Sequence, residues 1–346
     1  MGPFGKYKAP RQTANDGPSA NGPVARLGMS NRRLTGFLIS FSGAIIFSTK
    51  AILVKLALRH EHTDGLTLLM LRMLLSLPFY LLAAFWGSRK AGNVAMTRRQ
   101  WCYVILLGLL GYYVSSFFDF IGLQYISAGL ERLILFLYPS FSVVINALVF
   151  RQKMSKAQTG ALALTYVGIG IAYFGELKID TGNPNFYWGS FLIFLCAITY
   201  GCYLSGTGRM VGVVGASKFT TYSMLSATGA ILFHYFLRQA LRGEPLLPLA
   251  AGPGLWTYGI LLALVATVIP SFMLSAGMKI IGANNAAIVT SVGPVSTILQ
   301  AHFLLGDPIF AEQVVGTVLV IIGVLIIGWR GRAVEAEAEV EAEAKH

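Results

Sequence analysis

The chain has 346 residues, of which 55% are hydrophobic and only 12% charged, against about 25% charged in an average soluble domain. This composition excludes a water-soluble globule and predicts an all-α polytopic membrane protein, because a helix that crosses the hydrocarbon needs about 20 mostly apolar residues. The formal net charge of +12 is then loop charge that orients helices, and no nucleic-acid partner is expected. The three cysteines lie in apolar stretches without metal-ligand spacing, so they indicate neither a disulfide framework nor a zinc site. We expect no metal and no cofactor.

Ten apolar stretches follow one another between two polar tails. Residues 1–33 are rich in Gly, Pro, Ser and Asn, and residues 330–346 alternate Glu with small residues, so both tails are predicted to be disordered. Transmembrane helices are predicted near 34–58, 66–87, 101–125, 129–150, 157–175, 188–208, 218–237, 256–278, 285–305 and 313–329.

The charges of the connecting loops alternate along the chain. Lys and Arg follow the second, fourth, sixth, eighth and tenth predicted helices, whereas most of the opposite loops are acidic, with the loop after the seventh helix as the weak exception. Because positively charged loops stay on the cytoplasmic side, both termini are predicted to be cytoplasmic.

The second half of the chain repeats the first. A shift of 155 residues aligns Trp101 with Trp256 and Pro139 with Pro294, and a shift of 153 aligns the opening helices of the two halves. Each half is therefore predicted to be a five-helix unit. Since five is odd, the two units enter the membrane in opposite senses.

The predicted organisation is a first repeat over 34–175 and an inverted second repeat over 188–329. Inverted repeats are typical of secondary transporters, in which the solute site lies near the midplane where the repeats meet. We therefore expect alternating access around a shared central cavity.

Polar side chains share one face of several predicted helices, and such a face lies against protein or water, not lipid. The candidate solute-binding residues on these faces are Lys50, Tyr112, Ser142, Asn146, Tyr200, Tyr203, Thr290 and Thr297. Pro139 and Pro294 are expected to break their helices near the middle and to free a backbone carbonyl beside the cavity.

Ionisable residues inside predicted helices each cost about 2.5–3.5 kcal/mol at a helix centre, so they must be paired or hydrated. The candidates for coupling or gating are Arg72, Asp119, Glu131 and Arg132. In one interpretation Lys50 or Arg72 contacts an anionic group of the solute and Asp119 or Glu131 exchanges a proton. In the other, ion pairs lock the outer ends of helices one to four, and Lys55, Glu131 and Arg132 extend to the membrane interface.

Four segments of the chain, Gly36–Lys55, Leu71–Phe79, Gly122–Leu137 and Ala283–Gly323, resemble the drug/metabolite transporter superfamily, specifically the EamA-type ten-helix permeases. The resemblance implies a bacterial inner-membrane transporter, often an exporter of amino acids or other metabolites. It also implies a cavity lined by helices one, three, four, six, eight and nine, with helices five and ten at the rear. Relatives of this fold exchange sugar phosphates or nucleotide sugars, so the fold does not choose the solute.

The sequence thus predicts a secondary transporter that is not an enzyme, with a small solute and the bilayer as partners, as a monomer or homodimer. No phosphate-binding loop is present, so ATP hydrolysis is not expected. The alternatives are a channel and an intramembrane hydrolase that uses Ser205 with His234 or His302. The repeat symmetry argues against a channel. The hydrolase is disfavoured because no glycine lies two residues before Ser205 and no orienting carboxylate is evident.

Overall fold

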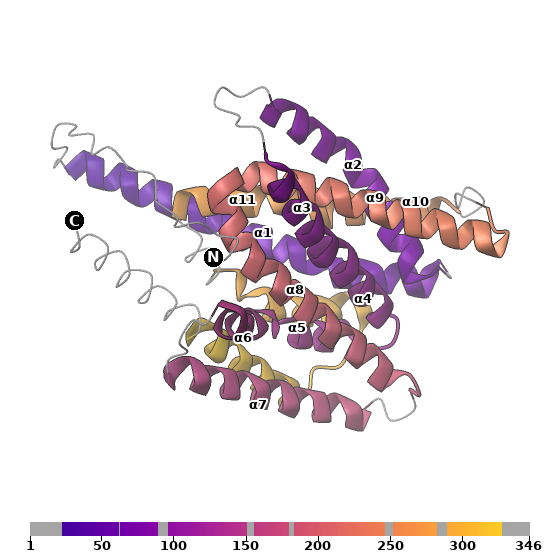
Figure 1. Ribbon diagram of the computed structural model, residues 1–346. Helices are drawn as coiled ribbons and strands as arrows, with labels where there is room; N and C mark the ends of the chain where they lie inside the picture. The colour runs from indigo at the N-terminus through magenta and orange to yellow at the C-terminus, as the bar shows by residue number, and fades with distance from the viewer. Residues whose placement is uncertain are drawn as a thin grey trace.

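The computed structural model describes residues 23–61, 63–88, 96–150, 156–179, 183–245, 252–281 and 289–326, and in these ranges all regular structure is helical (Figure 1). The first half contains α1 (Pro23–His60), α2 (Gly65–Ser88), α3 (Arg98–Gly108), the π-helical η1 (Leu109–Val114), α4 (Ser115–Gly122), α5 (Ala128–Leu135), α6 (Tyr138–Phe150) and α7 (Lys156–Ile179). The second half contains α8 (Phe186–Val214), α9 (Ala216–Arg242), α10 (Pro253–Ala263), η2 (Leu264–Val268), α11 (Ile269–Ile281), α13 (Gly293–Gln300), η3 (Ala301–Leu305) and a last helix, Ala311–Ile326.

Seven helical segments of the described residues are long and apolar enough to cross a membrane: Arg33–His60, Gly65–Trp86, Arg98–Gly122, Ala128–Val149, Gln158–Lys178, Phe186–Gly208 and Pro253–Ile281. The prediction of an all-helical membrane protein is confirmed. The other predicted spans correspond to α9, to α13 with η3, and to the shorter apolar helix Ala311–Ile326. The count of ten spans and their inverted insertion remain predictions.

The helix α1 begins before its apolar part. Residues 23–33, which the sequence analysis assigned to a disordered tail, are helical in the structure. After Pro23 this stretch contains no further proline and a single glycine, so a helix started by the apolar span can extend through it. The rest of both predicted tails, residues 1–22 and 330–346, lies outside the described residues.

Irregularities of the helices recur at the repeat distance. The π-helical segments η1 and η2 begin at Leu109 and Leu264, which the shift of 155 residues relates to each other. The turn at residues 136–137, between α5 and α6, corresponds in the same way to the turn at residues 291–292 before α13. Local backbone geometry therefore repeats together with the sequence.

Both helix breaks immediately precede a proline. Pro139 lies in the first turn of α6 and Pro294 in the first turn of α13. A proline inside a helix removes one backbone donor and clashes with the carbonyl four residues earlier, so the preceding turn cannot stay α-helical. The structure thus places both predicted helix-breaking residues at an interruption.

The two largest apolar clusters of the described residues form the centre of the bundle. The larger joins α1, α2, α4, α9 and α10 around Ile52, Leu69 and Phe120, and the smaller joins α5, α7 and α8 around Leu133 and Ile193. In Figure 1 α7 and the yellow last helix lie together at one edge, away from α2, α9 and α10. This position agrees with the rear placement that the family resemblance implies for helices five and ten.

The pairing of α7 with the last helix depends on small residues. A Cβ atom added to Gly168 would lie 2.7 Å from the Gly316 carbonyl oxygen, whereas one added to Gly170 would meet nothing within 4 Å. Gly168→Ala should therefore lower the free energy of unfolding by about 1–3 kcal/mol. Gly170→Ala, on the same helix, should be neutral or stabilise by up to about 1 kcal/mol. Equal melting temperatures of the two purified variants in detergent would contradict this packing.

An ion pair ties the start of α2 to the end of α9. Both Arg238 Nη atoms donate to the Asp64 carboxylate at 3.0 Å, and Asp64 also accepts the backbone N–H groups of Leu66 and Thr67. Burial opposes ionisation of Asp64, but the hydrogen bonds from Arg238 and Thr67 outweigh it and hold the pKa of this carboxyl below its ordinary value.

The lowered pKa of Asp64 fixes the sign of a pH effect. A carboxyl whose pKa is lower in the folded state adds stability above its ordinary pKa of about 4, and this gain disappears as the pH falls through the lower, folded value. Arg238→Gln should cost about 1 kcal/mol at neutral pH, since the pair is partly exposed. The difference from wild type in thermal unfolding should vanish in strong acid. Arg242→Gln, at an exposed position of the same helix, should show no such pH-dependent difference.

Candidate functional site

Three ionisable side chains meet inside the bundle. Lys50 on α1 donates to Asp119 Oδ2 on α4 and, at 3.3 Å, to Glu131 Oε1 on α5. Their exposed fractions are 5%, 3% and 0%. We call these residues the charged triad. The interpretation that Glu131 extends to the membrane interface is wrong, because α5 packs against α1, α8 and α13 and its first turns are covered.

The chain between α4 and α5 explains how two acids reach one lysine. Asp119 lies in the last turn of α4, and the Ser127 hydroxyl caps α5 by accepting the Leu130 N–H at 3.0 Å. The Ser127 N–H in turn donates to the buried carboxylate of Glu176 at 3.3 Å. This turn fixes the start of α5, so that Glu131 in its first turn faces α1 beside Asp119.

The triad has one carboxyl more than it has amines. Asp119 Oδ1 and Glu131 Oε2 are buried and have no hydrogen-bond donor. Both carboxyls contact the same Lys50 amine, so they lie near each other. One of them can therefore take up a proton while the other stays paired with Lys50, which suits reversible binding of one proton.

Two buried arginines flank the triad, with exposed fractions of 5% for Arg72 and 7% for Arg132. Arg72 Nε donates to Thr267 Oγ1 at 2.7 Å, and its guanidinium carbon lies 5.5 Å from the centre of the Phe120 ring. Arg132 lies over the rings of Phe47 and Phe136, at 5.6 and 5.7 Å, and its Nε has no hydrogen-bond partner. Counted with Lys50, three buried cations thus face two acids.

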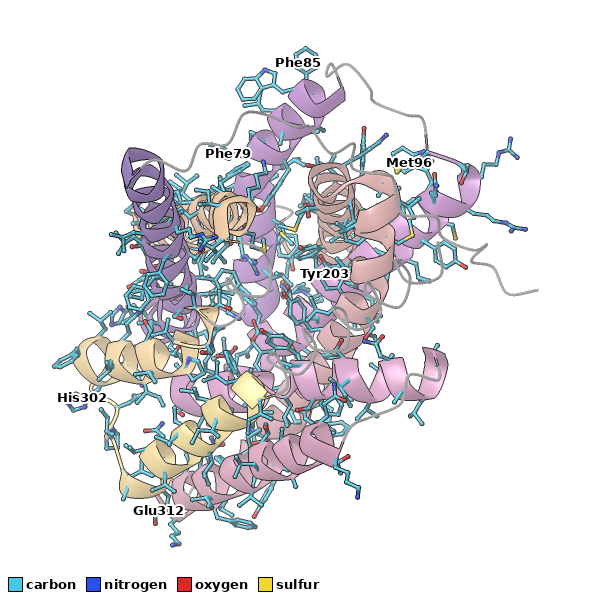
Figure 2. All side chains as sticks on the ribbon, turned by 90° about the vertical axis from the view of Figure 1, so that its left-hand side faces the viewer. Phe79, Phe85, Met96, Tyr203, His302 and Glu312 are labelled. Atoms are coloured by element: carbon cyan, nitrogen blue, oxygen red, sulfur yellow. The ribbon has the colours of Figure 1, made fainter. Side chains whose placement is uncertain are left out.

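A row of aromatic rings leads from Tyr112 to Arg132 across both halves of the chain. The Tyr203 hydroxyl donates to the Tyr112 hydroxyl at 2.9 Å, and Tyr203 lies in the middle of the molecule (Figure 2). The ring centre of Tyr200 lies 5.5 Å from that of Tyr203 and 5.1 Å from that of Tyr138. Tyr138 then contacts Phe136, at 5.8 Å. We call this set the aromatic row.

The other predicted solute-binding residues are not brought to the triad by any of their described contacts. Ser142 on α6 shares a hydrogen bond with Ser205 on α8 at 3.0 Å, and Asn146 lies one turn further along α6, half-buried. Thr297 donates to the Gly293 carbonyl of its own helix. Thr290 lies next to the turn that precedes α13.

The three residues of the hydrolase alternative lie in separate environments. Ser205 donates to backbone carbonyls of Gly201 and Ser142. His234 Nδ1 pairs with the Tyr113 hydroxyl at 3.0 Å, and His302 contacts the Asp307 carbonyl at 2.9 Å. The serine and the histidines therefore do not form a nucleophile–base pair.

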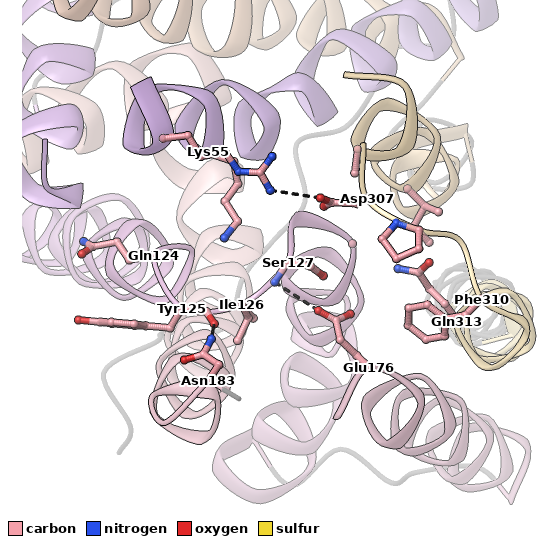
Figure 3. Close-up of a pocket in the computed structure, with 15 residues that line it drawn as sticks. Lys55, Gln124, Tyr125, Ile126, Ser127, Glu176, Asn183, Asp307, Phe310 and Gln313 are labelled. Atoms are coloured by element: carbon pink, nitrogen blue, oxygen red, sulfur yellow. Dashed lines mark hydrogen bonds and ion pairs between the residues drawn. The ribbon is translucent and has the colours of Figure 1, made fainter. Parts of the chain in front are cut away.

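A cavity of about 250 Å³ lies at the helix ends that the loop charges predict to be outside (Figure 3). Its lining residues are Lys55, Arg59, Gln124, Tyr125, Ile126, Ser127, Gly129, Glu176, Asn183, Ile298, Ala301, Asp307, Pro308, Phe310 and Gln313. The Arg59–Asp307 ion pair, at 3.3 Å, joins the two halves across it. Gly129 and Ile298 belong to α5 and α13, so the cavity reaches the seam between these helices.

The sequence pattern did not predict this outer cavity. Its polar residues come from loops and helix ends of both halves, and helical periodicity does not relate such positions. The sequence offered one signal, a glutamine that occurs at the same place in both repeats: Gln158 corresponds to Gln313 under the shift of 155 residues. Of this pair, Gln313 lines the cavity and Gln158 does not.

Known proteins resemble this chain in sequence and in fold. The model of the EamA-like transporter family matches residues 34–174 and 187–329. The uncharacterized transporter YcbK of Bacillus subtilis is 29% identical over 81% of this chain and 88% of its own length. The uncharacterized inner membrane transporter YicL of Salmonella typhimurium is 18% identical over 86% of this chain and 96% of its own length.

A solved crystal structure, 18% identical, superposes with a TM-score of 0.56 over 85% of this chain and 97% of its own length. At this identity the likeness concerns the fold alone. The family model covers nearly all of the apolar part of the chain, and the relatives above are named transporters. The chain therefore belongs to the EamA-like transporter family, within the drug/metabolite transporter superfamily.

Proposed function

We propose that this protein is a secondary active transporter that exports small organic solutes by alternating access around a central site. Membership of the family and the apolar helices support a membrane transporter. The observation that carries the proposal is the charged triad together with the aromatic row. Buried ionisable groups inside a membrane bundle are costly and commonly mark the path of a solute or ion.

The proposed architecture is ten spans in two inverted five-helix repeats, 34–175 and 188–329, in the inner membrane with both termini cytoplasmic. Two separate matches to the family model support it, as do the helix irregularities that recur at the repeat distance. The alternating loop charges support the opposite senses of insertion.

Single cysteines introduced at Lys153 and at Pro308 test this topology, after the three native cysteines are replaced. A membrane-impermeant maleimide should label the first only from the cytoplasmic side and the second only from the outside. The two positions correspond under the repeat shift, so labelling from the same side would contradict the inverted arrangement.

The proposed solute is an amphipathic molecule with a carboxylate, such as an amino acid or a related metabolite. The rings of the aromatic row suit an apolar body. At the site three cations, Lys50, Arg72 and Arg132, outnumber the two acids of the triad, and this surplus suits an anionic group. The same surplus also suits a phosphate, so exchange of sugar phosphates or nucleotide sugars is the second candidate. Asp119 and Glu131 would exchange the coupling proton, with Arg72 and Arg132 beside them in gating.

Counterflow in proteoliposomes tests the proposed function. Vesicles loaded with an unlabelled solute should take up the same labelled solute faster than empty vesicles, across a panel of amino acids, organic acids and sugar phosphates. A channel would show no such trans-acceleration, and a hydrolase would form product without two compartments. Repeating the assay with an imposed proton gradient tests the coupling.

A further inference from the structure

The helix α13 begins inside the protein with an unusual N-terminus. It starts at Gly293, after the turn at residues 291–292, and its N-cap residue Val292 offers no side-chain acceptor to the free amides. Pro294 supplies no amide of its own. The first turn of any helix carries exposed N–H groups and a partial positive charge, which together attract anions.

The side chain that lies against this N-terminus is a cation. A Cβ atom added to Gly293 would lie 2.8 Å from Arg132 Nη2, so the guanidinium packs directly on the first residue of α13. Arg132 is 7% exposed and its Nε has no partner. Within the part of the chain that the structure describes, no hydrogen bond or ion pair joins this guanidinium to another group. The Arg132 guanidinium and the partially positive N-terminus of α13 therefore lie against each other, an arrangement that a bound anion would stabilise.

The surroundings of Arg132 indicate what kind of anion fits. The rings of Phe47 and Phe136 flank the guanidinium, and Tyr138 continues the aromatic row from there. Gly129, one turn before Arg132, lines the outer cavity, as does Ile298 on α13. The site thus has one charged group, the guanidinium, with apolar rings around it. It lies next to the outer cavity, which is at the predicted outer ends of the helices.

Lys50 is poorly placed to bind the same anion. Its amine already contacts both Asp119 and Glu131, and an approaching carboxylate would meet two acids of its own sign. Of the three buried cations, Arg132 is the one whose charge no described carboxylate or hydroxyl meets within hydrogen-bonding distance.

We propose that Arg132 and the N-terminus of α13 form the anion-binding subsite of the central site, which takes the carboxylate of an organic acid with an apolar or aromatic body. The role of the subsite in transport rests on the proposed function. Binding itself does not, and it can be measured on the purified protein without any transport assay.

Thermal unfolding of the full chain in detergent, with sodium benzoate as the probe, tests the subsite. Benzoate should raise the melting temperature of the wild type in a saturable manner, relative to sodium chloride at the same ionic strength. Neutral benzamide, which has the same ring, should not. Arg132→Gln should weaken the benzoate response about tenfold or more, because it removes a charged hydrogen-bond donor. Arg99→Gln, at an exposed position near the start of α3, is the matched control and should respond as wild type does.

A second variant keeps the test valid if Arg132→Gln does not fold. Gly293→Ala retains the arginine but places a methyl group against its Nη2, and it should also weaken the benzoate response. Gly160→Ala, whose Cβ would meet nothing within 4 Å, should not.

Two results would overturn the subsite: a wild type that benzoate does not stabilise more than benzamide, or an Arg132→Gln variant that responds as the wild type does. Benzoate binding without counterflow of any solute would instead contradict the proposed transport function and leave the subsite standing.

Discussion

Lys50→Ala is expected to abolish counterflow and to lower the free energy of unfolding by about 3–5 kcal/mol, because it leaves buried acids without their cation. Asp119 and Glu131 both accept from the Lys50 amine, and none of the three side chains is more than 5% exposed. Without the lysine, two neighbouring carboxyls must either repel each other or take up protons. Folded yield and transport should therefore both fall.

Replacing both Lys50 and Asp119 by neutral residues distinguishes the effect of the triad on stability from its effect on transport. In the double variant Lys50→Met with Asp119→Asn, the only charge left within the triad is that of Glu131, which can take up a proton and hydrogen bond to the amide. This variant should recover most of the lost stability, measured as melting temperature and as the monodisperse fraction in size-exclusion chromatography. Counterflow per folded molecule should stay near the background of empty vesicles. Wild-type counterflow in the double variant would mean that the triad only holds α1, α4 and α5 together.

The sequence allowed a good prediction of the helices and a partial one of the site. Apolar runs of about 20 residues and alternating loop charges follow directly from the cost of placing polar groups in hydrocarbon. Lys50 and Asp119 were recognisable as deep because each lies well inside such a run. Which helices lie next to each other is a property of packing, and periodicity within one helix does not contain it.

The position of Glu131 is an example of what the sequence pattern could not predict. It is close to the start of its predicted helix, and such a position is ordinarily near the membrane interface. In the structure α5 starts at a turn covered by the end of α7, where Glu176 binds the Ser127 N–H, and the helix then breaks before Pro139. A short, covered helix therefore carries Glu131 and Arg132 into the interior.

The charge of the site is one-sided because symmetric positions have diverged. The repeat shift of 153 residues relates Lys50 on α1 to Tyr203 on α8. In the structure Lys50 belongs to the charged triad and Tyr203 to the aromatic row. At this pair of related positions the first half thus supplies an ionic group and the second half a ring, a difference that suits a solute with an ionic head and an apolar body.

Glu131→Gln is expected to uncouple transport from a proton gradient while it preserves exchange. Glutamine keeps the shape of the side chain and can still accept from Lys50, which stays paired with Asp119. The change removes the surplus carboxyl, so the variant should remain stable. It also removes the buried oxygen Oε2, which has no donor in the structure and is the natural place for a transported proton.

The measurement compares two assays on the same proteoliposomes. Gradient-driven accumulation should fall about tenfold or more in Glu131→Gln, because the remaining acid of the triad, Asp119, cannot take up a proton without leaving the Lys50 ammonium unpaired. Counterflow, which needs no net proton movement, should persist. Glu312→Gln is the control, since Glu312 also pairs with a lysine, Lys178 at 3.4 Å, but at the surface. If Glu131→Gln still accumulates solute in response to the gradient, the proton site lies outside the triad, and the contacts of Asp119 and Glu131 with Lys50 serve only to hold α4 and α5 against α1.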